Sequence, residues 1–167
     1  MAELTNNTNY VTANGFRVRC SHKDFKNLEY FAQTVSHPSM DVAESTIPFK
    51  GINLPVSGDK ITYAPVTMIF LLDEDMKSYI EIQEWLLRLA CANQVSAADA
   101  LIAEGKYPTE CDISVSPLTS HNNINKIFTY HGAFPTNLGG IELSSTQEGG
   151  EFLTFDATFK FAYYTIK

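Results

Sequence analysis

The last part of the chain, where apolar and polar residues alternate, constrains the fold most. A period of two is typical of a β-strand with one buried and one solvated face. At about 3.3 Å per residue, one unbroken strand over this stretch would run roughly 40 Å, which is long for so small a domain. We therefore expect a mainly β protein with a long terminal strand. Its apolar face holds Leu153, Phe155, Ala157, Phe159, Phe161 and Tyr163, and its polar face holds Thr154, Asp156, Thr158 and Lys160.

Residues 61–72, with the sequence ITYAPVTMIFLL, predict a second prominent strand. After Pro65 this segment is apolar on both faces, which is typical of a central strand that is covered on both sides. Pro65 should lie near its start, where the missing backbone donor does least harm. The preceding STIPFKGINLPVSG is interpreted as a short extended segment with turns at Gly51 and at Gly58-Asp59. Further strands are predicted at residues 16–21, 29–36, 112–116, 125–131 and 141–144.

The hydrophobic period changes to that of a helix over residues 75–92. Asp73 is placed as its N-cap, where a side-chain oxygen can accept from free backbone amides. The helix has two apolar rows, so one could face the sheet and the other a neighbouring chain, or both could pack inside one subunit. A second, short helix is predicted at residues 96–103. The two rows are Tyr79, Ile82, Leu86 and Leu89, and Met76, Ile80 and Leu87.

The 167 residues suit one domain, residues 15–167, preceded by a polar arm at residues 1–14. The predicted fold class is mainly β (α+β), an antiparallel β-barrel or sandwich with one flanking α-helix. The arm has neither a basic start nor an apolar core, which argues against an ordinary secretory signal. The longest apolar run is too short to span a bilayer, so no membrane partner is expected. The three cysteines are far apart and are interpreted as reduced thiols.

The charge and the motifs argue against tight nucleic-acid binding and against catalysis. Twelve basic and nineteen acidic residues leave a net charge of −7, whereas binding to a duplex needs clustered Lys and Arg. No G-x-S-x-G motif occurs, and the histidines have no metal-binding spacing. We therefore expect a protein that is not an enzyme and holds no cofactor or metal. The histidines are His22, His37, His121 and His131.

The glycine-rich segment GAFPTNLGG could be a phosphate-binding loop, but the residues that follow it do not fit that role. No Lys-Ser or Lys-Thr follows it, and no helix is predicted to begin there. Its glycines are therefore assigned to backbone geometry, either a positive φ or a close approach of chains. Pro135 is expected to fix a turn, with Phe134 as an apolar plug at its tip.

Four blocks, taken in order, resemble the tail tube proteins of contractile-tailed bacteriophages of the myovirus type. The blocks are GDKITYAPVTMIFLLDED, a helix with IQEW, HGAFPTNLGGIEL and a terminal aromatic strand that ends in FAYY. The resemblance covers residues 16–166 and extends to baseplate tube-initiator proteins and type VI secretion tube proteins. Trp85 corresponds to the aromatic residue of the family's long helix, and Gly58-Asp59 to the turn before its central strand. The family's Gly-aromatic-Pro-x-Asn-Leu/Val-Gly loop is matched by Gly132, Phe134, Pro135, Asn137, Leu138 and Gly139.

The resemblance implies a structural virion protein whose hexameric rings stack into the inner tube of a contractile tail, the conduit for the genome. Its implied partners are other copies of itself, the tail sheath and the baseplate or tube-initiator proteins, while viral DNA passes through the lumen without specific binding. It implies a place in the phage tail, with assembly in the host cytoplasm. Subunit or ring contacts are expected at Phe134, Pro135, Asn137, Leu138 and Trp85, and part of the lumen lining at Thr154, Asp156, Thr158 and Lys160.

Several alternatives stay open at the level of the sequence. A baseplate tube-initiator protein or a type VI secretion-like tube protein would share the same landmarks. Residues 93–110, which vary within the family, could adapt the subunit to a baseplate ring. A small β-sandwich binding protein or an enzyme is compatible with the periodicities alone.

Overall fold

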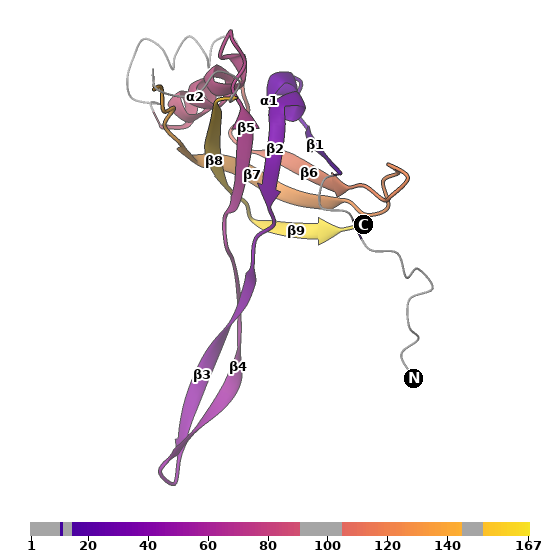
Figure 1. Ribbon diagram of the computed structural model, residues 1–167. Helices are drawn as coiled ribbons and strands as arrows, with labels where there is room; N and C mark the ends of the chain where they lie inside the picture. The colour runs from indigo at the N-terminus through magenta and orange to yellow at the C-terminus, as the bar shows by residue number, and fades with distance from the viewer. Residues whose placement is uncertain (1–10, 12–14, 91–104, 145–151) are drawn as a thin grey trace.

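The computed structural model describes residues 11, 15–90, 105–144 and 152–167. The predicted helix at residues 96–103 and the thiol of Cys91 lie outside these ranges. Figure 1 shows a body of sheet and helices from which one long β-hairpin projects. The body and the hairpin are hydrogen-bonded as two separate sheets.

The body is built on a seven-stranded antiparallel sheet in the order β1-β6-β7-β8-β5-β2, with β9 also paired to β7. The predicted central strand is β5, which lies between β8 and β2. Strands β1 and β2 end the path and do not pair with each other, so the described sheet is open there and forms no closed barrel. The prediction of a mainly β, antiparallel, helix-flanked fold is confirmed. The strands are β1 (Phe16–Cys20), β2 (Ala32–Ser36), β5 (Val66–Leu71), β6 (Cys111–Pro117), β7 (Phe128–Leu138), β8 (Thr154–Lys160) and β9 (Tyr163–Ile166).

The glycine-rich segment begins at the bend in the middle of β7 and continues just past the end of this strand. The first half of this strand pairs with β6 and β9, and its second half pairs with β8. Between the halves, Gly132 has a φ of 63°, in the left-handed region that favours glycine. A register shift between Pro135 and Asn137 bends the strand again. The assignment to backbone geometry is confirmed for Gly132 and for Gly139, where a Cβ would collide with Asp156, but Gly140 shows neither feature. The predicted tip is wrong, because pairing keeps Phe134 and Pro135 inside the sheet.

The terminal alternating run bends together with β7. It forms two strands, β8 and β9, that are separated by a break at residues 161–162. Both run antiparallel to β7, and beside its bend the Ala162 N–H donates to the His131 carbonyl oxygen at 3.0 Å. The predicted single 40 Å strand is therefore wrong, since the run turns with its partner. The alternation itself is confirmed in β8, whose buried residues are Phe155, Ala157 and Phe159.

A helix occupies part of the segment that was predicted as the strand 29–36. This helix, α1 (Lys26–Phe31), leads directly into β2. Its first turn is held by the carboxylate of Glu81, which accepts hydrogen bonds from Asn27 Nδ2 at 2.6 Å and from the Leu28 N–H at 3.0 Å. The prediction failed because the group that satisfies this turn lies on a helix far along the chain.

The long predicted helix is α2 (Lys77–Ala90), which begins at Lys77 rather than at residue 75, while residues 91–92 of the prediction lie outside the described ranges. Asp73 holds its start, as predicted, by accepting hydrogen bonds from the Lys77 and Ser78 backbone N–H groups at 3.0 and 3.1 Å. Of the two apolar rows, the one with Ile82 packs into the core, whereas Ile80 of the other row remains exposed. The helix therefore has one buried apolar row, and part of its second apolar row is accessible to solvent.

Trp85 lies at the centre of the core. Its side chain is fully buried within the subunit, and its ring centroid lies 4.5 Å from that of Phe25 and 6.1 Å from that of Phe159. The indole Nε1 donates a hydrogen bond to the Pro108 carbonyl oxygen at 2.7 Å. Contrary to the expected subunit contact at Trp85, its ring has no surface left for a neighbouring chain, so its role is in the stability of the fold.

The remaining strand predictions differ at their ends. The strand predicted at 112–116 is confirmed as β6, and the strand predicted at 125–131 begins at Phe128 and continues through the bend. Residues 141–144 belong to none of the strands.

Candidate functional site

The hairpin of β3 (Met40–Phe49) and β4 (Ile52–Tyr63) extends away from the body (Figure 1). The two strands pair only with each other in the described structure. In the outer half of the hairpin, apolar residues oppose one another across the strands and so share one face. Polar residues and prolines occupy the other face. The apolar face consists of Ile47, Phe49, Ile52, Leu54 and Val56.

The apolar face of the hairpin is uncovered in the described part of the chain. Exposure of its side chains ranges from 41% at Val56 to 60% at Ile52. A two-stranded hairpin is marginally stable in water by itself, and its unpaired edges and apolar surface invite association. This face therefore has the properties of a surface that a partner covers.

The turn of the hairpin agrees with the sequence prediction, but the second predicted turn is wrong. Lys50 and Gly51 have positive φ values of 45° and 85° and form the turn. Gly58 lies within β4, opposite a bulge between Val42 and Glu44. A Cβ at Gly58 would collide with the carbonyl oxygen of Ala43, so glycine here permits a close approach of two backbones.

A groove of about 460 Å³ lies between the C-terminal end of α2 and the second half of β7. Phe134 does not project from a tip, as was expected, but lies half-buried in this groove, paired in register with Lys160 of β8. Glu110 lies at the rim, with its carboxylate above Gly132, where a Cβ would come within 3.1 Å of Oε2. The groove is lined by Leu86, Leu89, Ala90, Thr109, Glu110, Phe134, Pro135 and Thr136.

The sheet face that carries the predicted lumen residues is mixed, because Ile69 and Leu71 of β5 lie opposite Asp156 and Thr154. Helix α2 packs on the other face, where Tyr79 contacts Phe155 and Trp85 contacts Phe159. The outward positions of β8 oppose neutral residues of the adjacent strands, such as Thr67 and Asn137 beside Thr158. The four residues Thr154, Asp156, Thr158 and Lys160 thus share one accessible face. Of the residues expected at contacts, Asn137 is exposed, Leu138 is half-buried and Pro135 is buried.

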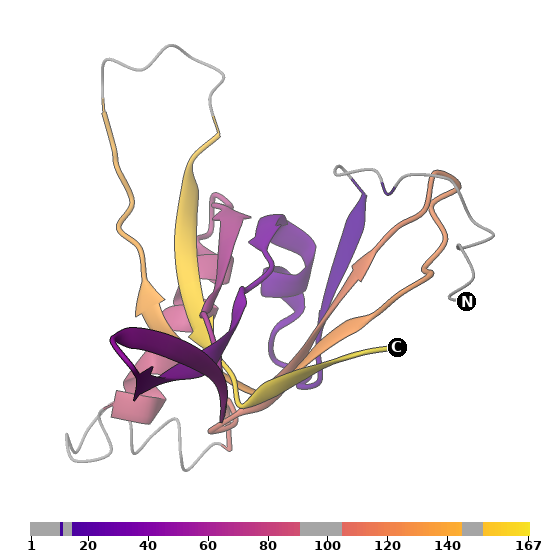
Figure 2. The ribbon, with the colours of Figure 1, turned by 90° about the horizontal axis from the view of Figure 1, so that it is seen from below.

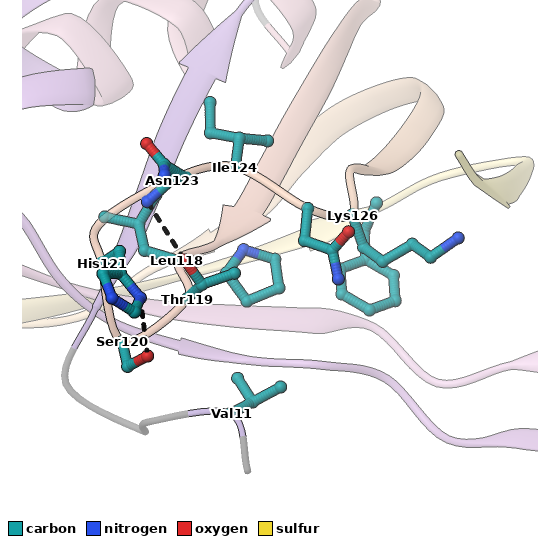
Figure 3. A pocket seen from close by; sticks show the side chains of 11 residues that line it. Val11, Leu118, Thr119, Ser120, His121, Asn123, Ile124 and Lys126 are labelled. Atoms are coloured by element: carbon teal, nitrogen blue, oxygen red, sulfur yellow. Dashed lines mark hydrogen bonds between the residues drawn. The ribbon is translucent and has the colours of Figure 1, made fainter. Parts of the chain in front are cut away.

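Three residues that the sequence did not connect form a hydrogen-bonded chain. His131 Nδ1 donates to Asp112 Oδ2 at 3.0 Å, and His131 Nε2 lies 3.0 Å from Thr165 Oγ1. Carboxylate, imidazole and hydroxyl in this order also occur in acyl-transfer triads. Here they join β6, β7 and β9, and none of the three lines the groove or the pocket in Figure 3. Their evident role is to hold the short strand β9 against the sheet.

A pocket of about 430 Å³ lies at the connection from β6 to β7 (Figure 3). Its wall is a turn closed by a hydrogen bond from the Asn123 N–H to Thr119 Oγ1 at 3.2 Å, and the side chains of His121 and Lys126 border it. No group of three or more potential metal ligands occurs among the described residues. In the same residues, neither helix is long and apolar enough to cross a membrane.

Three titratable side chains of the interior have a raised pKa. Burial raises the pKa of Glu81 despite its hydrogen bonds from α1. Burial, and then the hydrogen bond to Glu84, raise the pKa of Tyr107. The pKa of Cys20 is raised first by a hydrogen bond with Cys111 and then by burial. A neutral thiol and phenol are poor nucleophiles, so these groups serve packing.

The chain belongs to the phage tail tube protein family, whose model matches residues 3–167. The match includes most of the polar arm, whereas the resemblance of the four blocks begins at residue 16. The chain is 29% identical over 115 residues to the tail tube protein of Serratia phage KSP90, covering 67% of this chain but only 60% of that protein, less than two thirds of its length. It is 22% identical over 161 residues to the tail tube terminator protein of Enterobacteria phage T4, covering 84% of this chain and 88% of that protein.

Solved structures show the same fold at low identity. A chain of the sheath/tube terminator of the PVC extracellular contractile injection system has a TM-score of 0.69 at 13% identity, covering 96% of this chain and 99% of that chain. A chain of its sheath-tube complex has a TM-score of 0.64 at 15% identity, covering 95% and 91%. A type six secretion system protein has a TM-score of 0.53 at 8% identity, covering 92% and 83%. The chain thus shares its fold with proteins of contractile injection systems and with a type six secretion system protein.

The hairpin and the groove were the features that sequence reasoning missed. A signal for the hairpin was present, because Ile47 and Phe49 on one side of Lys50-Gly51 and Ile52 and Leu54 on the other alternate like two strands around a turn. The stretch was instead interpreted as a short extended segment with a second turn at Gly58-Asp59. No comparable signal existed for the groove, which joins residues of three separate segments.

Proposed function

We propose that this chain is the subunit of the inner tube of a contractile phage tail. Six copies close a ring, the rings stack, and the hollow tube conducts the viral genome within a sheath that grows from a baseplate. Membership of the tail tube family supports a structural role in the virion tail. We infer no catalytic activity and no cofactor.

The observation that carries this proposal is the uncovered apolar face of the β3–β4 hairpin. Five apolar side chains on one face remain accessible in the described subunit. Burial of such a face against another copy removes apolar surface from water. It also stabilises a two-stranded hairpin, which by itself is only marginally stable in water. A contact between two different surfaces of identical subunits repeats until it closes a ring or continues along a tube.

The polar face of β8 is proposed to line part of the lumen. It lies opposite the face that α2 covers, and its residues are Thr154, Asp156, Thr158 and Lys160. A net charge of −7 per chain, repeated around each ring, repels a polyanion, so DNA would pass without binding. Contacts within or between rings are proposed at the accessible part of β7, including Phe134, Asn137 and Leu138, with Pro135 shaping the strand beneath them.

A tube terminator is the second candidate function. The match to the T4 terminator protein covers more of both chains than the match to the KSP90 tube protein. A terminator would form one ring on the end of a tube of a different protein, whereas a tube subunit would extend by itself. The length of the particles formed by the purified chain distinguishes the two.

The test compares assembly of the purified chain with that of two hairpin variants. Mass photometry over a concentration series, with negative-stain imaging of the heaviest fraction, should show rings and tubes of the unmodified chain. Ile47→Asn on the apolar face should block tube formation, while Thr46→Asn on the opposite face should leave it intact. Monomers at every concentration, even with seeds of preformed tails, would overturn the proposed function. Single rings that never elongate would favour the terminator.

A further inference from the structure

We propose that the tip of the β3–β4 hairpin of one copy docks in the α2–β7 groove of the next copy along the tube, where Lys50 pairs with Glu110. This inference rests on the proposed function and names the surface that receives the hairpin. The occupant is a second copy of this chain.

The first argument is the placement of the two surfaces in one subunit. Figure 1 shows the hairpin tip at one end of the molecule and α2 at the other. Figure 2, seen from below, shows the dark purple hairpin in front of α2. The tip and α2 are therefore far apart along the length of the hairpin, but they overlap when the molecule is viewed along that length. A copy displaced along the hairpin presents its own α2 end to that tip, and the contact repeats without closing.

The second argument is the match in apolar surface. Phe49 and Ile52 form the last apolar pair before the turn, and both are more than half exposed. The groove is walled by aliphatic residues of α2 and by Phe134 and Pro135 of β7. A dry cavity of about 150 Å³ can hold a benzene ring, so a groove of about 460 Å³ has room for the Phe49 ring and its neighbour.

The third argument is charge. Residues 45–57, the outer half of the hairpin, carry one charged side chain, which is Lys50. Its Nζ lies 5.5 Å from the Phe49 ring centroid, so the charge accompanies the apolar tip. Among the groove-lining residues, only Glu110 is charged. Within the part of the chain that the structure describes, neither Lys50 nor Glu110 forms an ion pair. Docking would therefore unite two unpaired opposite charges at the edge of an apolar contact.

Charge exchange tests this contact directly. The critical concentration for tube formation is measured by sedimentation for Lys50→Glu, for Glu110→Lys and for the double variant. Each single change should raise it about tenfold or more, the effect of losing a close interfacial charge pair. The double variant should return it to within about threefold of the unmodified chain. Lys60→Glu, on the hairpin but away from the tip, and Glu142→Lys, outside the groove, are matched controls that should have little effect.

The melting temperature of each variant shows whether it folds. If Glu110→Lys is unstable, Glu110→Gln replaces it and should raise the critical concentration while abolishing the penalty of Lys50→Glu in the double variant. Two results would overturn the docking contact while leaving the tube function intact. One is that the unmodified chain forms tubes but the double variant does not recover tube formation. The other is that Lys50→Glu and Lys60→Glu have equal effects. Absence of tubes from the unmodified chain would instead overturn the proposed function.

Discussion

The β3–β4 hairpin and the helix-covered part of the sheet contain the same kind of alternating strand, but only one of them is covered. In β8, Phe155 and Phe159 are almost fully buried beneath α2, with 2% and 1% exposure. On the hairpin, Ile47 and Phe49 are 54% and 52% exposed in equally regular pairing. Alternation therefore defines an apolar face but does not determine what covers it. Among the described residues, nothing covers this face of the hairpin.

The largest effect is expected in the covered region, at Trp85. Trp85→Ala should lower the free energy of unfolding by about 3–5 kcal/mol, because it leaves a cavity among packed rings and removes the hydrogen bond to Pro108. Urea denaturation of the monomer, followed by circular dichroism, measures this change. Trp85→Phe retains most of the packing and should lose clearly less. A stability unchanged by Trp85→Ala would mean that the ring does not belong to the core.

A matched pair of isoleucines compares the two regions directly. Ile82 on α2 is fully buried, and Ile82→Ala should lower the free energy of unfolding by about 2–5 kcal/mol. Ile47→Ala on the hairpin should change it by no more than about 0.5 kcal/mol in the monomer, because the side chain is already half in water. The same hairpin variant should weaken assembly. Equal losses of monomer stability in both variants would remove the distinction between a covered and an uncovered face.

A smaller effect on stability is expected at Asp73, which caps the start of helix α2 in the covered region. Burial opposes ionisation of this carboxylate, but hydrogen bonds from Ser78 and Lys77 outweigh it and lower its pKa below the ordinary value of 3.8. A carboxylate with a lowered folded-state pKa stabilises the fold above its unfolded pKa, and this stabilisation is lost as the pH falls through the folded value. Asp73→Asn keeps one capping oxygen but removes the negative charge at the helix N-terminus, so it should cost about 0.3–1 kcal/mol at neutral pH, and the difference from the unmodified chain should shrink below pH 3.8.

The control for Asp73 is Asp75→Asn. Asp75 pairs with Lys77 at 2.6 Å, but both side chains are largely exposed, so this variant should change stability very little. Thermal unfolding from pH 2 to pH 7 checks both variants. A pH-independent difference at Asp73 would show that its contribution does not depend on the charge.

The local pattern of the chain was sufficient where an element is defined by its own residues. The period-two alternation of β8 and the doubly apolar β5 predicted strands, and the helical spacing over α2 predicted the one long helix. The assignment of the glycine-rich segment to backbone geometry also followed from its neighbours. The resemblance of four ordered blocks identified the family, which the family model confirms.

Tertiary structure decided the features that depend on partners distant in the sequence. Helix α1 forms because Glu81 satisfies its first turn, and the terminal run breaks at residues 161–162 because β7 bends beside it at Gly132. The groove exists only where α2 meets β7. The apolar hairpin residues are visible in the sequence, but their exposure is not. A sequence pattern reports which side chains share a face, whereas the cover of that face depends on where the rest of the chain can reach.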